Sequence, residues 1–202
     1  LISIVYTSLT AICQTDLKRI IAYSSVAHMN LIMLGLFSLN LQGIGGSVLQ
    51  MICHGVVSSA LFLGIGVIYD RFHTRLLKHY GGLVHFMPLF ITTFLFFSFA
   101  NAALPGTCNF VGEILLFAGI FQKNPIITLF ACSGIILSGA YSLWLFNRIA
   151  YGNVKLQYLS NISDFNEREL HVFLPLIFFT LLLGIFPNFI LEKITMVNIL
   201  GF

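Results

Sequence analysis

Residues 99–115 read FANAALPGTCNFVGEIL, and this stretch decides how the chain is built. It lies within an apolar run, Met87–Phe121, that is longer than the roughly 20 residues one membrane helix needs. Pro105 has no backbone N–H, and its ring clashes with the carbonyl four residues earlier. Gly106 next to it tolerates almost any backbone angle. The run therefore predicts two half-helices joined at residues 104–106.

The same stretch contains Glu113, the one carboxylate inside an apolar segment of this sequence. A charge in a membrane interior is costly, and such residues usually serve a path for ions or protons. A broken membrane helix beside a buried acid is typical of the ion sites of transporters. A packing kink and a structural carboxylate are the alternatives. The closeness of the two features favours function.

The composition is that of an integral membrane protein. Of the 202 residues, 58% are hydrophobic and 8% charged, against about 25% charged in soluble domains. The four cysteines lie far apart, without zinc or iron–sulfur spacing, and they favour packing over disulfides. No glycine-rich nucleotide motif is present, and the net charge of +3 forms no nucleic-acid patch. We expect no metal, cofactor or nucleic acid to bind this chain.

The hydrophobic runs predict an all-α polytopic membrane protein with about six transmembrane helices, one of them discontinuous at Pro105-Gly106. The first run is short for a membrane span and has no basic region of a signal peptide, so we expect the chain to begin inside a helix. Residues 70–85 form a basic loop and residues 150–169 a polar one. The predicted helices are Leu1–Cys13, Leu17–Leu39, Ile44–Tyr69, the broken run, Ile126–Ile149 and Leu170–Ile190.

Two helices have a polar face. Ser24 and His28 are four residues apart on the second helix, and therefore lie on one side of it. On the third helix a stripe faces one direction, which must be other helices or a wet cavity. A histidine in such a stripe suits a proton path, and interhelical hydrogen bonding is the alternative. The stripe consists of Ser47, Gln50, His54 and Ser58.

The basic residues predict the orientation. With the broken helix counted as one crossing, eight lysines and arginines fall on one side and only Lys123 and Lys193 on the other. The positive-inside rule then places the richer side in the cytoplasm or the mitochondrial matrix, with the C-terminus opposite. A glycosylation sequon at residues 161–163 is discounted because it lies on that inner side. The eight are Lys18, Arg19, Arg71, Arg75, Lys78, Arg148, Lys155 and Arg168.

Three stretches together resemble a known family. Residues 15–29 (TDLKRIIAYSSVAHM), 50–55 (QMICHG) and 104–113 (LPGTCNFVGE) are similar to signatures of the antiporter-like subunits of respiratory complex I, NADH:ubiquinone oxidoreductase. The resemblance covers essentially the whole chain. Glu113 stands where other members of that family have lysine, which points to its glutamate-bearing subunit.

The resemblance implies a fold and a site. Residues 1–149 correspond to the second of two inverted five-helix repeats, with its first helix truncated. Residues 150–169 would be a matrix-side loop, and 170–202 a final helix and tail. The family's central polar axis carries over to His28, His54 and Glu113. Lys18 matches a signature lysine. It lies at the start of its helix, where anchoring lipid headgroups is the alternative role. Ser24, Ser58, Gln50, Pro105 and Gly106 would support the path.

The resemblance also implies a function. Members pump protons in the mitochondrial inner membrane or a bacterial equivalent, while NADH, flavin, iron–sulfur clusters and ubiquinone bind other subunits. Expected partners are the N-terminal half of the protein, neighbouring antiporter-like subunits and membrane lipids. Frequent phenylalanine (21 residues) favours organellar coding and thus mitochondria. A multisubunit cation/proton antiporter shares the fold and is one alternative, and a purely structural scaffold is another.

Overall fold

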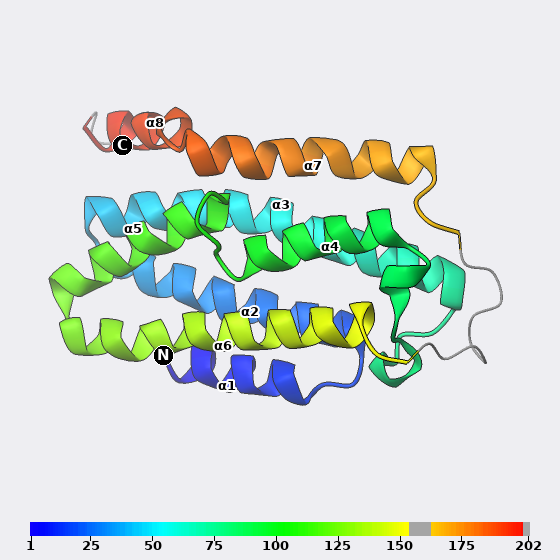
Figure 1. Ribbon diagram of the computed structural model, residues 1–202. Helices are drawn as coiled ribbons and strands as arrows, with labels where there is room; N and C mark the ends of the chain where they lie inside the picture. The colour runs from blue at the N-terminus through cyan, green and yellow to red at the C-terminus, as the bar shows by residue number, and fades with distance from the viewer. Residues whose placement is uncertain (154–162, 200–202) are drawn as a thin grey trace.

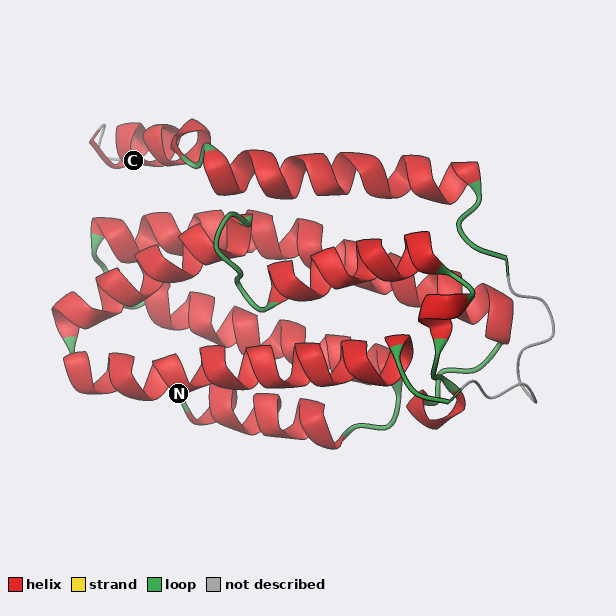
Figure 2. Cartoon of the chain, in the orientation of Figure 1, coloured by secondary structure: helices red, strands yellow, loops and turns green. Residues whose placement is uncertain are grey.

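The computed structural model describes residues 1–153 and 163–199, and these residues fold into α-helices that lie side by side (Figures 1 and 2). No strand occurs among them; one isolated antiparallel bridge joins Asp16 to Leu76. Two short 3-10 turns, η1 (Leu77–His79) and η2 (Leu83–His85), lie in the basic loop. The helices are α1 (Ile2–Cys13), α2 (Leu17–Leu36), α3 (Leu41–Phe72), α4 (Pro88–Asn101), α5 (Cys108–Lys123), α6 (Pro125–Ala150), α7 (Glu167–Ile185) and α8 (Asn188–Ile199).

The all-α polytopic architecture expected from the sequence is confirmed. In the described part of the chain, α2, α3, α6 and α7 are each long and apolar enough to cross a membrane. The half-helices α4 and α5 follow one another as a further, interrupted crossing (Figure 1). Helix α1 has 12 residues, about 18 Å of helix, and packs against α2 and α6.

The break in the membrane helix is where the Pro-Gly pair predicts it. Helix α4 ends at Asn101 and α5 begins at Cys108, so no continuous helix passes through this segment. Gly106 has a φ of +94°, in the left-handed region that a β-carbon disfavours. Asn109, one residue into α5, donates from Nδ2 to the Ala100 carbonyl at 3.0 Å. This carbonyl at the end of α4 also accepts from the Ala103 amide at 3.2 Å, so the side chain adds a second hydrogen bond that ties α5 to α4.

Several predicted helix ends were wrong. Helix α3 runs over Leu41–Phe72, beyond the predicted Ile44–Tyr69, and at 32 residues measures about 48 Å. The predicted last helix, Leu170–Ile190, is in fact two helices. It ends at Ile185, because Pro187 restricts Phe186 before it, and α8 begins at Asn188. A helix therefore stands where the sequence suggested only a short tail.

Helix α3 is the centre of the bundle. It contacts α2, α4, α5, α7 and α8, and its buried residues include Ser47, Gln50 and His54 of the predicted polar stripe but not Ser58. On the apolar side, Leu49, Val57 and Ile68 are among the most deeply buried residues of the core. Helix α7 lies along the outer edge against α3 and α5, while α1 lies at the opposite edge (Figure 1).

The basic residues gather at one end of the bundle, here called the basic end. They stand at the start of α2, the end of α3, the following loop, the end of α6 and the start of α7, which meet at one end in Figure 1. Lys123 and Lys193 lie in α5 and α8, which reach the other end. Lys155 lies outside the described residues, and so do residues 161 and 162 of the sequon. The described members of the basic end are Lys18, Arg19, Arg71, Arg75, Lys78, Arg148 and Arg168.

Candidate functional site

Glu113 lies in the interior of the bundle, with 3% of its surface exposed. It sits in the second turn of α5, and its Oε1 is 3.2 Å from Nδ1 of His28 on α2. His28 is likewise buried, at 4% exposed. Glu113 therefore faces a histidine in the interior of the bundle rather than lipid. A carboxylate and an imidazole are thus in contact across two helices.

The second ring nitrogen of His28 also has a partner. Its Nε2 is 3.3 Å from the hydroxyl of Tyr141, which comes from α6. If Nδ1 carries the proton and donates to Glu113, then Nε2 accepts from the tyrosine O–H. This tautomer is assigned from the hydrogen-bond partners. His28 therefore bridges a carboxylate and a phenol with its two nitrogens.

Gln50 of α3 completes the surroundings of the carboxylate. Its Nε2 donates to Glu113 Oε1 at 3.5 Å, a long hydrogen bond, and its side chain is fully buried. Gly112 makes this approach feasible. A β-carbon at residue 112 would lie 3.1 Å from Cβ and 3.2 Å from Cα of Gln50, and even closer to its Oε1. The glycine beside Glu113 therefore permits α3 to pack tightly against α5.

His54 of α3 stands next to His28. The two ring centroids are 5.1 Å apart, and Nε2 of His54 is 3.2 Å from the hydroxyl of Ser25 on α2. Both histidines are buried, so a second positive charge beside the first would be strongly disfavoured. The predicted axis of Glu113, His28 and His54 is therefore one continuous cluster in space, although its role in proton movement remains a prediction.

Several polar atoms around this cluster lack a protein partner. They are Glu113 Oε2, Gln50 Oε1 and His54 Nδ1, all deeply buried. A buried polar atom without a hydrogen bond costs about 1–3 kcal/mol, so these atoms call for water. A cavity of about 10 Å³ adjoins Glu113, His28 and Tyr141, and this is close to the volume one water needs. Of the three residues with orphaned atoms, Glu113 lines this cavity, so a water there could bind its carboxylate.

Of the two supporting serines predicted from the sequence, Ser24 lies at the site and Ser58 does not. Ser24 is buried and bonded to the Ile21 carbonyl, and with Tyr141 it lines a second small cavity. Ser58 bonds only within its own helix, to Gly55 at 3.4 Å, and does not reach the cluster. Ser47 of the same stripe instead ties α3 to the Ile32 carbonyl of α2.

The remaining predicted residues lie away from the carboxylate. Lys18 is ten residues, or about 15 Å, before His28 on α2, with its ammonium 5.7 Å from the ring of Tyr69. Pro105 and Gly106 shape the break and are exposed there. Glu113 lies five residues after the start of α5, about 7.5 Å away. The field of a helix end weakens beyond its first turn, so the expected influence of the half-helix end on this site is small.

Sequence reasoning missed three residues of the site: Tyr141, Ser25 and Asn109. Tyr141 shares one side of its helix with Ser138 and Ser142, but nothing in a single sequence shows that α6 packs against α2. Ser25 is adjacent to Ser24, and its contact with His54 depends on how α3 packs against α2. Asn109 contacts the end of α4, and this contact depends on where α4 ends.

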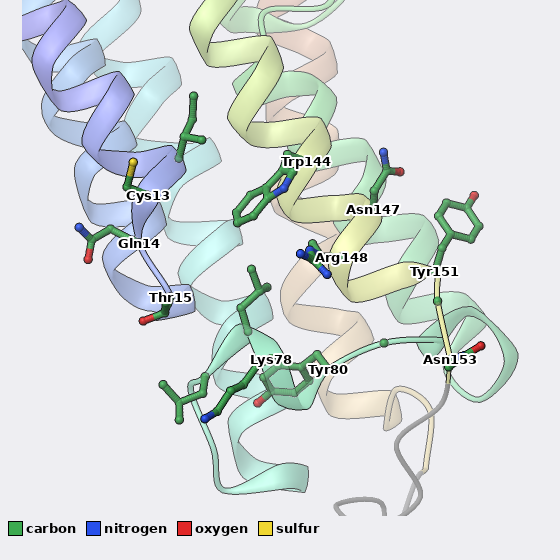
Figure 3. A pocket seen from close by; sticks show the side chains of 15 residues that line it. Cys13, Gln14, Thr15, Lys78, Tyr80, Trp144, Asn147, Arg148, Tyr151 and Asn153 are labelled. Atoms are coloured by element: carbon green, nitrogen blue, oxygen red, sulfur yellow. The ribbon is translucent and has the colours of Figure 1, made fainter.

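A larger hollow of about 780 Å³ opens at the basic end and shares no lining residue with these cavities. Figure 3 shows Trp144 and Arg148 of α6 around it, with Lys78 of η1 and Tyr80, which follows η1. The guanidinium of Arg148 is 5.9 Å from the Trp144 ring. Burial raises the pKa of Tyr80 above that of a free tyrosine. Aromatic and basic side chains of this kind are typical of the headgroup level of a membrane.

Metal ligands do not gather in the described residues, where no group of three or more His, Cys, Asp or Glu could hold an ion. The chemistry that the buried cluster supports is proton transfer between oxygen and nitrogen atoms.

The fold and the site define an antiporter-like membrane protein, and the comparisons agree. The sequence profile described as NADH:quinone oxidoreductase/Mrp antiporter, TM, matches residues 1–138, so the chain belongs to that family. A curated relative from Marchantia polymorpha, NADH-ubiquinone oxidoreductase chain 4, is 56% identical over 95% of this chain and 39% of its own length. NADH-quinone oxidoreductase subunit M of Rhodobacter capsulatus is 52% identical over 96% of this chain and 38% of its own.

Solved structures show the same architecture. A chain of respiratory complex I from Thermus thermophilus aligns with a TM-score of 0.89 and 28% identity, over 96% of this chain and 41% of that one. A chain of the Mrp complex from Dietzia sp. aligns with a TM-score of 0.80 at 20% identity, over 95% of this chain and 44% of that one, which shows the fold alone. The chain spans about two fifths of the length of the curated relatives it matches.

Proposed function

We propose that this chain is the C-terminal part of the proton-translocating subunit 4 of respiratory complex I. The contact between His28 and Glu113 carries the proposal, because it joins two titratable groups inside a membrane bundle. Identities above 50% to chain 4 and subunit M of NADH oxidoreductases support it. Residues 1–149 would be the second five-helix repeat, and 170–202 the final helix and tail.

The chemistry is proton hopping. A histidine with an unperturbed pKa of about 6.5 can both take and give a proton near neutrality. Conformational changes driven by electron transfer elsewhere in the complex would alter the balance between His28 and Glu113. NADH, flavin, iron–sulfur clusters and ubiquinone would bind other subunits, and no cofactor this chain. The partners would be the N-terminal half of the protein, neighbouring antiporter-like subunits and lipids.

The location follows from the same relatives. Chain 4 relatives from a liverwort, flowering plants and algae favour the mitochondrial inner membrane for this chain. The basic end would face the matrix, and the C-terminus the intermembrane space. The relative from Rhodobacter capsulatus, at 52% identity, supports a bacterial membrane as the alternative location.

A subunit of a multisubunit cation/proton antiporter is the alternative function. The family description and the Mrp structure support it at the level of fold. It predicts turnover that depends on sodium and is independent of NADH. Purification with flavin and iron–sulfur subunits would exclude it.

The test is Glu113→Gln in the assembled complex. The variant is nearly isosteric, so the complex should form in normal amount. General acid–base groups contribute about 10²–10⁴-fold to proton transfer, so ubiquinone-linked NADH oxidation and proton uptake should fall at least about tenfold. The control is Glu167→Gln, the same change at an exposed position in the first turn of α7. Wild-type oxidation and uptake with Glu113→Gln would exclude titration of Glu113 during turnover.

A further inference from the structure

Tyr141 separates two small cavities inside the bundle. It is 1% exposed and reaches from α6 between α2 and α4. The first cavity adjoins His28, Glu113 and Ser138. The second is lined on its polar side by Ser24, Ser98, Asn101 and Ser142. Each has a volume of about 10 Å³, close to the volume that one water occupies. Tyr141 is the one polar residue that lines both.

The second cavity lies toward the basic end. On α2, Ser24 is one turn nearer than His28 to the helix start at the basic end. On α6, Ser142 follows Tyr141 toward Ala150, and that end of α6 is also at the basic end (Figure 1). Helix α4 runs from the basic end to Asn101, so Ser98 and Asn101 stand at the end of α4 that lies inside the bundle. Ser24 and Ser142 therefore place the second cavity on the basic-end side of Tyr141.

The tyrosine hydroxyl can connect the two cavities. It is 3.3 Å from His28 Nε2 beside the first cavity, and Ser24 and Asn101 line the second cavity with it. A phenol has one proton to donate and lone pairs that accept. It can therefore accept a proton on one side while it donates its own on the other. Its ring is otherwise packed among apolar side chains, so the hydroxyl offers the polar connection here.

We propose that Tyr141 is the relay through which protons pass between the basic-end cavity and the His28–Glu113 pair. This inference rests on the proposed function. An excess proton held by water beside Ser24 and Asn101 binds the phenol oxygen as the phenolic proton passes to His28 Nε2. The proton on His28 Nδ1 then passes to the carboxylate of Glu113. One proton enters and Glu113 becomes neutral, while Tyr141 and His28 carry no charge afterwards.

The alternative is that Tyr141 only holds His28 in place by a hydrogen bond. Tyr141→Phe keeps the ring but removes the hydroxyl, so it abolishes both the proton relay and the positioning of His28. The experiment therefore needs a measurement that responds to proton transfer and not to packing. The solvent deuterium isotope effect on turnover is such a readout, because it rises when proton transfer limits the rate. The matched control is Tyr80→Phe, which removes a buried hydroxyl bonded to the Thr74 carbonyl, away from the two cavities.

The experiment uses the whole complex in native membranes. With Tyr141→Phe we expect ubiquinone-linked NADH oxidation and proton uptake to fall at least about tenfold, with a larger isotope effect. Tyr80→Phe should change neither. A fall with an unchanged isotope effect would assign Tyr141 a purely structural role, and wild-type turnover would equally overturn the relay.

A second variant keeps the test decisive if Tyr141→Phe does not assemble. Ser24→Ala with Ser142→Ala removes two hydroxyls from the basic-end cavity, each bonded within its own helix. We expect the same fall in NADH oxidation and proton uptake and the same larger isotope effect, and wild-type behaviour would overturn the proposal.

Glu113→Gln, measured in parallel, separates the relay through Tyr141 from the proposed function of the chain. If it is impaired while Tyr141 variants are normal, the relay fails and the proposed function stands.

Discussion

At the scale of single residues, the site depends on a glycine, Gly112, as much as on its titratable side chains. Gly112 precedes Glu113 and faces Gln50, whose side chain occupies the space a β-carbon would need. Glu113 receives a long hydrogen bond from Gln50 and its main contact from His28. Small residues of this kind let membrane helices approach closely. The position of the carboxylate is therefore set by helix packing as well as by its own chemistry.

We expect Gly112→Ala to disturb this packing. The added methyl group must displace Gln50, whose Cα would be only 3.2 Å away and its Oε1 closer still, and such overpacking costs about 1–3 kcal/mol. The temperature at which the solubilised complex loses half of its activity should fall. The control is Gly66→Ala in α3, where a β-carbon meets nothing within 4 Å. There, helix propensity favours alanine by up to about 1 kcal/mol. Equal stability of the two variants would contradict the close approach of Gln50 to Gly112.

At the scale of elements, Arg71 ties the end of α3 to the segment that leads into α7. Its guanidinium donates to both carboxylate oxygens of Glu169, at 3.1 and 2.7 Å, and to the carbonyls of Ser163 and Asp164. Asp164 in turn accepts from the Leu89 and Phe90 amides at the start of α4. One arginine therefore fixes α3, α4 and α7 relative to one another at the basic end.

We expect Arg71→Ala to destabilise the bundle at this end. Hydrogen bonds to charged groups contribute about 1.5–3 kcal/mol, and Arg71 is mostly buried, with a side chain 8% exposed. Because Glu169 is 22% exposed, solvent screening reduces the effect, so we expect a loss of about 1–2 kcal/mol. Thermal inactivation of the solubilised complex measures it. Arg19→Ala is the control: its ion pair with Asp16 is 3.4 Å long, on a side chain 70% exposed. Equal losses of stability in the two variants would contradict the role of Arg71 in joining α3 to the segment that leads into α7.

The broken helix shows what a sequence can predict about an element. Pro105 and Gly106 predicted the break between Asn101 and Cys108 because backbone chemistry is local. The contact of Asn109 with the Ala100 carbonyl depends on the angle between two half-helices, which no local pattern encodes. The split after Ile185 was missed although Pro187 is just as plain. Apolar residues continue on both sides of that proline, and they read as one helix.

The site shows the same division. Glu113, His28 and His54 stood out because titratable residues are rare in apolar helices, and the structure places them in one cluster. Tyr141 did not stand out, since a tyrosine in a membrane helix is ordinary. Its contact with His28 arises from the packing of α6 on α2, between residues 113 positions apart. Long-range packing is the part that a single sequence does not reveal.

At the scale of the whole molecule, the distribution of charge predicts how the bundle stands in its membrane. Seven described lysines and arginines gather at the basic end, and Lys123 and Lys193 at the other. Cytoplasmic and matrix loops carry such an excess because positive residues translocate poorly. The basic end should thus face the side on which NADH is oxidised. The relay proposed for Tyr141 would then take protons from that side.

The last prediction tests this orientation directly. Arg19→Cys and Lys123→Cys place one exposed thiol at each end, in a background with Cys13→Ser, since Cys13 is itself exposed. We expect a membrane-impermeant maleimide to modify residue 19 only in vesicles that oxidise added NADH, where the inner face points outward. Residue 123 should react only in vesicles of the opposite orientation. Mass spectrometry of this chain's peptides separates the signal from cysteines of other subunits. Modification of residue 123 from the NADH side would reverse the orientation, and with it the direction in which Tyr141 conducts protons.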